Sequence, residues 1–578
     1  MFEINYLKSK KIDLEHLEKQ YGKIQKSQYP DLETTVNPFH IEKLQNYNPI
    51  YSLFFEMTPK NYNSISLNHP KQFIDLNTVW NESLQIKLPN TPVYIKYAPL
   101  LDPIHYLIGK YDKDKDKLNV LPNLDFSNET HLEKITSPYN SAYIDCFFSY
   151  LSGQLLSQHG FIHGIEFYGS YLGIQKKFRM NITDDYEYLQ QSKFFLSNKN
   201  QLYELESSSP EINKPKLIFG EECVFEADVL DDEIMGDVLL PEDLELVYQN
   251  ADANVDVDVD VDQTNDDSSS ASNSRVNDSS EEDNSSESEE NPVECETDSI
   301  SDTNSEWSDM EDDPEVISYI YNFPIQMICS EKCEGTFDYL LENNLLDEPQ
   351  IASAFFQIVM TLAAYQRAFS FTHNDLHTNN IVYTTTSAKF IEYRFLQKTY
   401  LVPTFGKIYK IIDFGRAIYR FQDKILCSDS FATGGDAHSQ YNIEPFMNTK
   451  KPRLEPNPSF DLCRLGCSLY DFVFDNEDEE IIRENESTWS EIQKTVYRWC
   501  TDDNGKNILY KRSGEERYPD FKLYKMIARI VHKHTAENQI QYTLFSQYEQ
   551  TGKEKKKRGE KIIMNIDIIP KCYTAFSS

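Results

Sequence analysis

Apolar and polar positions follow two different spacings along the chain, and the spacing changes from one predicted region to the next. Over residues 51–180 the apolar residues come mostly in short runs typical of strands, with one helical pattern at 140–158. Over residues 314–545 strand-like runs are followed by long segments with the 3.6-residue spacing of helices. Residues 181–313, between them, keep neither spacing over a whole domain. The pattern indicates two ordered regions separated by a long insertion.

The first region contains a predicted pair of strands. Residues 84–88 and 93–97 have the alternation of strands, and a turn sequence with two prolines joins them at 89–92. We expect these two strands to form a hairpin. The helix predicted at 140–158 follows, and it presents a strongly apolar face.

The insertion has two parts of different composition. Residues 181–250 show no clean pattern and are expected to hold a few short elements. Residues 251–313 hold 23 acidic residues against the single basic residue Arg275, a charge of −22. Because like charges repel and few aromatic residues are present to form a core, this second part is predicted to be a disordered linker.

The second region opens with strand runs at 316–321 and 325–329, which a short polar connection joins to a helix. Thr336 is placed to cap that helix, and Asp347 followed by Pro349 opens a longer one. The apolar residues of the longer helix recur at helical spacing: Ile351, Phe355, Ile358, Val359 and Leu362. We expect this helix to be buried. Further helices are expected over 489–540.

Net charge restricts the classes of partner. The 578 residues carry a net charge of −38, of which −16 lies outside the acidic segment. Nucleic-acid phosphates and anionic lipids repel such a protein, so both are poor partners and basic ones are favoured. The ten cysteines form no metal-ligand or disulfide framework. No signal-peptide pattern and no apolar run of the ~18 residues that span a membrane is found, so we expect a soluble, cytoplasmic protein.

Candidate chemistry is concentrated in residues 371–383. Asp375 precedes Asn380 there by five positions, and apolar residues surround both. Downstream, a second apolar run ends in Asp413, followed by a Phe-Gly pair. Magnesium is a hard cation that takes a few protein oxygens together with phosphate oxygens. Two acids and one amide, each beside an apolar run, therefore predict a magnesium-nucleotide site.

These motifs resemble those of the eukaryotic-type protein kinase superfamily. The spacing from Asp375 to Asn380 and the later Asp-Phe-Gly match the catalytic loop and the metal-binding motif of that family. The chain is most similar to the serine/threonine kinases of giant DNA viruses. The features that carry this similarity are the His-Asn-Asp-Leu-His motif, the long segment before Asp-Phe-Gly and the acidic insertion. The resemblance covers about residues 80–180 and 315–540.

The resemblance implies a fold and a reaction. The fold would be of the α+β class, with a small β-rich N-lobe, a larger helical C-lobe and the acidic insertion between parts of the N-lobe. ATP and Mg²⁺ would be the cofactors, and the acceptor would be a Ser or Thr hydroxyl of a protein. A viral member would work in the host cytoplasm or be carried in the virion.

The resemblance also assigns roles to residues. Asp375 would be the catalytic base, and Asn380 and Asp413 the metal ligands. Lys96, in a predicted strand, and His377, where many members have a lysine, would contact ATP.

Two further residues would support the site. Asp461, in a predicted buried helix at 460–466, would hold the backbone of the catalytic loop. In the family a glutamate on the helix corresponding to 140–158 pairs with the strand lysine, and the only acid inside that helix is Asp145. Asp145 has a shorter reach than glutamate, and an exposed helix acid stays open as its alternative role.

Several positions depart from the family pattern. No Gly-x-Gly-x-x-Gly precedes Lys96, and Asn374 replaces the arginine that normally reads a phosphorylated activation segment. The activation segment, 416–457, lacks Ala-Pro-Glu. The 33 positions from Asn380 to Asp413 are a long gap, which predicts an elongated hairpin.

The departures keep two alternatives open beside a protein kinase. A small-molecule kinase of the aminoglycoside- or choline-kinase type is suggested by His377 and by the missing arginine. A pseudokinase that binds partners through the acidic insertion is suggested by the missing glycine-rich loop.

The expected organisation has seven segments. They are a helical leader of unknown role (1–50), the first part of the N-lobe (51–180), an insertion (181–250), the acidic linker (251–313), the last N-lobe strand and hinge (314–334), the C-lobe (335–545) and a tail (546–578).

Overall fold

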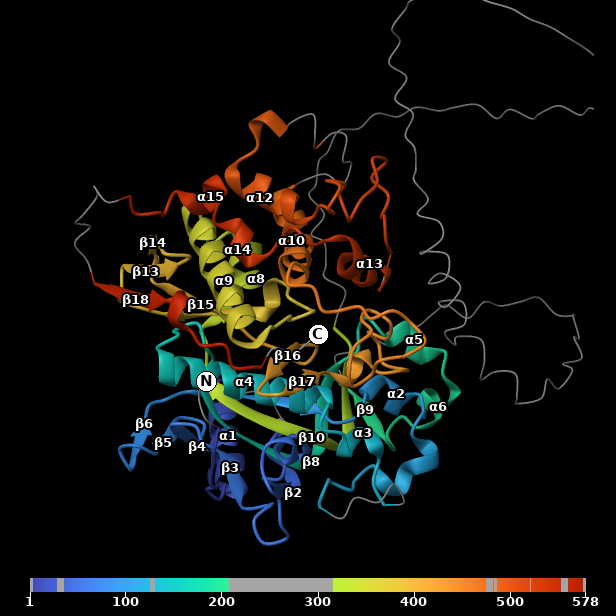
Figure 1. The fold of residues 1–578 in the computed structure, drawn as a ribbon. Helices are drawn as coiled ribbons and strands as arrows, with labels where there is room; N and C mark the ends of the chain where they lie inside the picture. The colour runs from blue at the N-terminus through green and yellow to red at the C-terminus, as the bar shows by residue number, and fades with distance from the viewer. Residues whose placement is uncertain are drawn as a thin grey trace, which may run out of the picture. The chain divides into compact units, whose positions relative to one another are not determined.

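A twisted antiparallel sheet carries the first set of candidate residues. Its strand order is β2 (Ile41–Gln45), β8 (Phe167–Asn181), β10 (Ile317–Glu331) and β7 (Val93–Pro99), and β9 (Tyr203–Leu205) pairs with β10 outside this path. The computed structural model describes residues 4–28, 36–124, 130–206, 315–474, 482, 486–519, 521–551 and 560–574. All of them belong to one compact unit. The sheet is drawn with its long strands β8 and β10 side by side in Figure 1.

Helix α4 (Ser141–His159) packs against β8 and β10 and confirms the helix predicted there. Asn140 caps its start by accepting a hydrogen bond from the backbone N–H of Ala142. Gly160 ends it in the left-handed conformation at φ 64°, which glycine adopts without a Cβ clash. Nearly every side chain from Ala142 to Leu155 is buried. The helix is therefore a fixed support for any polar side chain that it carries.

The second region is built around helix α9 (Glu348–Phe369). Its first turn is closed by the predicted cap, since Asp347 accepts from the backbone of Gln350 and the Gln350 side chain accepts from the backbone of Asp347. Thr336 caps α8 (Phe337–Glu342) as predicted. Several helices gather around α9 or pack on one another (Figure 1): α10 (Phe460–Val473), α12 (Glu491–Trp499), α13 (Lys522–Ile530), α14 (Ala536–Gln539) and α15 (Thr543–Ser546).

The long gap between Asn380 and Asp413 forms the predicted hairpin. Strand β12 (Ile381–Thr385) pairs with β15 (Lys407–Ile411), and β13 (Phe390–Phe395) pairs with β14 (Lys398–Pro403) further out. Strand β18 (Lys561–Asn565), from the predicted tail, adds to β13 in parallel. Two short pairings complete this region: β11 (Gly335–Thr336) with β12, and β16 (Ile418–Phe421) with β17 (Lys424–Cys427).

The hairpin predicted at 84–97 is wrong. Strand β6 (Ile86–Pro89) pairs with β5 (Thr78–Asn81), which pairs with β4 (Lys71–Asp75), whereas β7 pairs with β10. The alternation identified both strands, but a period of two carries no information about the partner. Strand β10 offers β7 a continuous register of seven residues, from Val93 to Pro99.

The predicted strand pair at 316–329 is a single strand, β10, and the leader is not only helical. Besides α1 (Leu14–Gln28), residues 1–50 contribute β1 (Tyr6–Lys8), which pairs with β3 (Ile65–Leu67), and β2, which extends the main sheet beside β8. Gly173 of β8 leaves room for this approach, because a Cβ there would overlap the side chain of Ile41.

The remaining described helices are short: α2 (Pro103–Leu107), α3 (Glu133–Thr136), α5 (Tyr186–Gln190) and α6 (Lys193–Ser197). Residues 207–250 of the predicted insertion and the acidic segment 251–313 lie outside the described residues. Among the helices that are described, none combines the length and the apolar character needed to cross a bilayer. The fold is thus α+β, with several small sheets and a helical region.

Candidate active site

Lys96 stands between two carboxylates that come from distant parts of the chain. Its strand register opposite Ile328 directs the side chain toward α4 and toward the end of β15. The Nζ atom lies 2.6 Å from Oδ2 of Asp145 and 2.8 Å from Oδ1 of Asp413. The pairing of Lys96 with Asp145, which the sequence left open, is therefore present. A lysine held by two acids has a fixed position from which it can meet an anionic ligand.

The pKa values of these groups reflect burial and mutual charge. Burial by itself would lower the pKa of Lys96, but the charges and hydrogen bonds of Asp145 and Asp413 raise it above its usual value. Burial would likewise raise the pKa of Asp413, yet Lys96 outweighs it and lowers the pKa to about 2. Burial and the charge of Asp413 raise the pKa of Asp145 against the opposing effect of Lys96. Asp413 is thus an ionised carboxylate whose side chain is 46% exposed, as a metal ligand requires.

Asp145 also joins helix α4 to the residues that follow β15. Its second oxygen, Oδ1, accepts a hydrogen bond of 3.0 Å from the backbone N–H of Phe414. Asp413 adopts φ 63°, a left-handed conformation that aspartate tolerates better than most residues. The two contacts of Asp145 and this backbone conformation fix the direction of the Asp413 side chain.

Asp461 holds the backbone of the predicted catalytic loop. Its carboxylate, which is fully buried on α10, accepts from the backbone N–H of His373 at 2.9 and 3.0 Å and from that of Asn374 at 3.0 Å. Burial raises the pKa of Asp461 to about 6, although His373 and these N–H groups act in the opposite direction. The geometry agrees with the supporting role expected for Asp461. His373 in turn donates from Nε2 to the carbonyl of Ile412 at 2.9 Å, which ties this loop to the residue before Asp413.

Asn380 braces the same loop from its other end. Its amide nitrogen donates to the backbone carbonyl of Asp375 at 2.9 Å and to Nε2 of His377 at 3.0 Å. Both bonds use the nitrogen, so the amide oxygen stays available as a ligand. Burial lowers the pKa of His377, which makes the ring neutral near pH 7. A neutral His377 can orient Asn380 or donate a hydrogen bond, but it does not supply the positive charge of a lysine.

The side chain of Asp375 has a partner that sequence reasoning missed. Its Oδ1 accepts a hydrogen bond of 2.9 Å from the hydroxyl of Tyr524, on α13. Arg464, on α10, donates from Nε to that same hydroxyl oxygen at 2.8 Å. A helix was expected in this part of the chain, within 489–540, but no local pattern marks Tyr524, which lies 149 positions from Asp375.

Asn374 forms a neutral clamp across the loop. Its amide nitrogen donates to the carbonyls of Thr372 (3.2 Å) and Arg416 (3.0 Å), and its amide oxygen accepts from the hydroxyl of Tyr441 (2.8 Å). The residue is buried and adopts φ 66°. Asn374, which stands where the kinase family has an arginine, therefore contacts the following segment through uncharged groups.

We expect Asn374→Ala to lower the free energy of unfolding by about 3 kcal/mol. The substitution removes the three hydrogen bonds of a buried side chain and places alanine in a left-handed conformation. Urea denaturation measures the change. The matched control is Asn344→Ala, at an exposed asparagine with φ 51°, where only the conformational cost of about 1 kcal/mol applies. Equal losses in the two variants would contradict the clamp.

A cavity of about 250 Å³ opens beside Lys96. Its walls combine apolar side chains with Lys96, Ser149, the carboxylates and the polar connection after β10, as in small-molecule sites of slightly larger size. The lining residues are Tyr94, Lys96, Asp145, Ser149, Ile165, Ile328, Ser330, Glu331, Cys333, Gly335, Thr336, Val382, Ile412, Asp413 and Phe414. None of the described residues before Tyr94 lines it. The cavity thus has the acids and the lysine among its lining residues, and no described residue of the preceding strands covers it.

The residues that could hold a divalent cation are Asp413 and Asn380. No group of three or more His, Cys, Asp and Glu side chains suited to a metal occurs in the described part of the chain. Magnesium bound with a nucleotide needs only one or two protein oxygens, because phosphates and water complete its shell. The donor set of one carboxylate and one amide oxygen fits that use.

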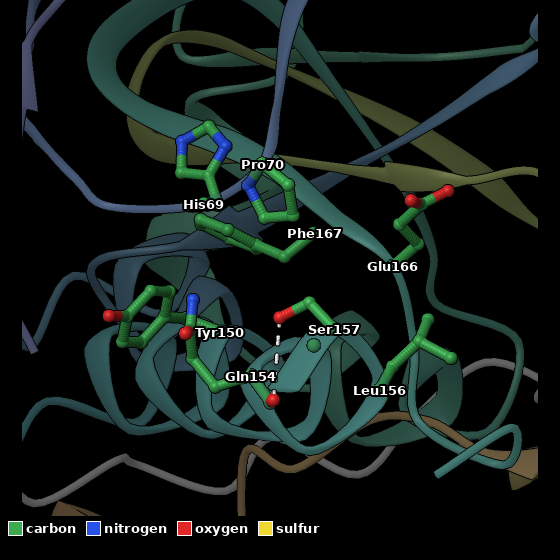
Figure 2. Close-up of a pocket in the computed structure, with 9 residues that line it drawn as sticks. His69, Pro70, Tyr150, Gln154, Leu156, Ser157, Glu166 and Phe167 are labelled. Atoms are coloured by element: carbon green, nitrogen blue, oxygen red, sulfur yellow. Dashed lines mark hydrogen bonds between the residues drawn. The ribbon is translucent and has the colours of Figure 1, made fainter. Parts of the chain in front are cut away.

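A second cavity, between α4 and the start of β8, is not a comparable site (Figure 2). Its volume is about 40 Å³, close to the space that a single water molecule occupies. The polar groups around it already serve the fold: Ser157 donates to the carbonyl of Gln154, and Glu166 forms an ion pair with Lys71. We assign no ligand to it.

Compared with models of known protein families and with curated proteins, the chain matches none. What it does is inferred from its own residues. Lys96, Asp145 and Asp413 form one contacting group, and Asp375, His377 and Asn380 belong to one loop, whose backbone Asp461 holds from α10. His373 joins the two groups through Ile412.

Proposed function

We propose that the chain is an ATP-dependent protein kinase that transfers the γ-phosphoryl group to Ser or Thr hydroxyls of proteins. Its fold would be the two-lobe arrangement, with the sheet and α4 in the small lobe and the helices around α9 in the large one. The observation that carries the proposal is the position of Lys96 between Asp145 and Asp413 at one wall of a cavity. Phosphoryl transfer depends on such positioned charges more than on covalent chemistry.

Each residue has a distinct task in this proposal. Lys96 would neutralise phosphate oxygens, and Asp145 would keep the lysine extended toward them. Asp413 and Asn380 would hold Mg²⁺, which supplies positive charge to the phosphates when bound. Asp375 would accept the proton of the attacking hydroxyl, and the polar connection after β10 would present backbone groups to the adenine edge.

The remaining features bear on acceptor and regulation. The net charge of the chain favours a basic protein as acceptor over nucleic acid. The neutral clamp of Asn374 gives the activation segment a docking contact that needs no phosphate, so activity should not require phosphorylation of that segment. The small-molecule kinase is a second candidate because a neutral His377 occupies the place of the lysine.

The decisive experiment is transfer of labelled phosphate from ATP in the presence of magnesium. Three acceptor classes should be compared: a basic histone mixture, acidic casein, and small alcohols such as choline. Label on serine or threonine of a protein supports the proposal, and label on a small alcohol alone would favour the second candidate. No transfer together with no magnesium-dependent ATP binding would remove both enzyme functions and leave the pseudokinase.

A further inference from the structure

The predicted base is held by a chain of two side chains from the helical region. Arg464 donates a hydrogen bond of 2.8 Å to the Tyr524 hydroxyl oxygen. The Tyr524 hydroxyl in turn donates a hydrogen bond of 2.9 Å to Oδ1 of Asp375. The direction of both bonds follows from chemistry, since a guanidinium only donates and an ionised carboxylate only accepts. The contact covers one of the two carboxylate oxygens of Asp375.

The ring of Tyr524 is fixed before it meets Asp375. It stacks on Phe521 with centroids 5.1 Å apart and planes at 13°, and it packs against Phe460 at 6.0 Å. Two guanidinium groups lie over it, Arg464 at 5.3 Å and Arg416 at 5.8 Å. A ring held on several sides delivers its hydroxyl with little rotational freedom.

Among the described residues Arg464 forms no salt bridge, whereas Arg416 is paired with Asp436. Burial lowers the pKa of Arg464, but the hydroxyl of Tyr524 and the charge of Asp375 raise it above its usual value. The positive charge of Arg464 therefore acts on the Tyr524 oxygen, which makes the hydroxyl a stronger donor to Asp375. Burial and the charge of Asp375 raise the pKa of Tyr524, with Arg464 opposing, so the phenol keeps its proton near neutral pH. Helix α10 thus supports the loop twice, through Asp461 on the backbone and through Arg464 on the side chain.

We propose that Tyr524, supported by Arg464, is a positioning residue that orients Asp375 for proton transfer by holding Oδ1 and leaving Oδ2 for the acceptor hydroxyl. The inference rests on the proposed function. In the reaction the acceptor proton goes to Oδ2, the acceptor oxygen forms the new bond to phosphorus, and ADP leaves with the electron pair of the broken bond. Tyr524 gains and loses no proton in this step.

We expect Tyr524→Phe to reduce kcat about tenfold while KM for ATP and the unfolding midpoint stay unchanged. The phenyl ring keeps the stacking contacts, and the substitution removes the two hydrogen bonds of the hydroxyl, the one to Asp375 and the one from Arg464. Transfer from labelled ATP to the histone mixture or casein, whichever accepts faster, gives both constants. The matched control is Tyr188→Phe, at an exposed tyrosine on α5, which should change neither constant.

The role of Arg464 is tested by replacing it alone and together with Tyr524. Arg464→Met should lower kcat, Arg464→Lys should restore part of the loss, and Arg464→Met added to Tyr524→Phe should cost nothing further. Non-additivity of this kind is expected only if Arg464 acts on Asp375 through the Tyr524 hydroxyl. If the losses in kcat multiply in the double variant, Arg464 does not act through Tyr524, and the proposed support of Tyr524 by Arg464 is overturned.

The outcomes separate this inference from the proposed function. If the unaltered protein transfers phosphate and Tyr524→Phe has the same kcat, the positioning role is removed and the kinase stands. If the unaltered protein transfers phosphate to no acceptor, both are removed. A fall in the unfolding midpoint that accounts for the loss of rate would also overturn the positioning role, because the tyrosine would then be only structural.

Discussion

Asp375→Asn is expected to reduce the rate of phosphoryl transfer by roughly a thousandfold while ATP binding is retained. Asparagine has the shape of aspartate, and its amide oxygen can still accept from the Tyr524 hydroxyl. The bond from Asn380 goes to the backbone carbonyl of residue 375, so the loop keeps its brace. What the variant lacks is a group that accepts the proton of the attacking hydroxyl.

The measurement is single-turnover transfer from labelled ATP, with nucleotide binding followed separately by titration. Asp347→Asn is the matched control, because Asp347 caps α9 and asparagine caps a helix as well as aspartate does. Its rate should equal that of the unaltered protein. A normal rate for Asp375→Asn would remove Asp375 as the base.

Lys96→Met is expected to lower transfer by roughly a hundredfold and the free energy of unfolding by about 3 kcal/mol. The side chain of Asp145 is only 4% exposed, so removing its cation leaves a buried charge without compensation. Asp413, nearly half exposed, loses the charge that lowers its pKa, which weakens it as a metal ligand. Stability and activity therefore fall for different reasons.

Two further variants separate those reasons. Adding Asp145→Asn to Lys96→Met should recover much of the stability, because the amide keeps an acceptor for Phe414 without a charge, and it should recover none of the activity. Lys71→Met breaks a more exposed ion pair with Glu166 and should cost less than about 1 kcal/mol with unchanged transfer. Activity that returns with stability would contradict a direct role for Lys96.

Elements whose signals are local were predicted well. Thr336 and Asp347 each cap the helix that the sequence assigned to them, since a cap and the N–H groups it satisfies lie within a few residues. The five-residue spacing of Asp375 and Asn380 likewise suffices to bring the amide of Asn380 to the backbone of Asp375. Such contacts depend on the chain only over one turn or one loop.

Pairings between distant segments were predicted poorly. Strands 84–88 and 93–97 were recognised, but each has another partner, because alternation identifies a strand face and not its neighbour. The single strand β10 appeared as two runs because Asn322 and Pro324 interrupt its apolar pattern. The segment taken as a helical leader supplies β2, whose partner β8 lies far along the chain.

By itself, the sequence determined which residues are the candidates for chemistry: Asp375, Asn380, Asp413, Lys96 and Asp461. Only the tertiary structure decided how they meet. It chose Asp145 as the partner of Lys96 across 49 positions, and it brought Tyr524 to Asp375 across 149. The physical reason is that these long-range contacts form when α4, α10 and α13 are buried and packed together. Burial and packing depend on the whole fold, so the pattern of a short stretch of chain does not reveal them.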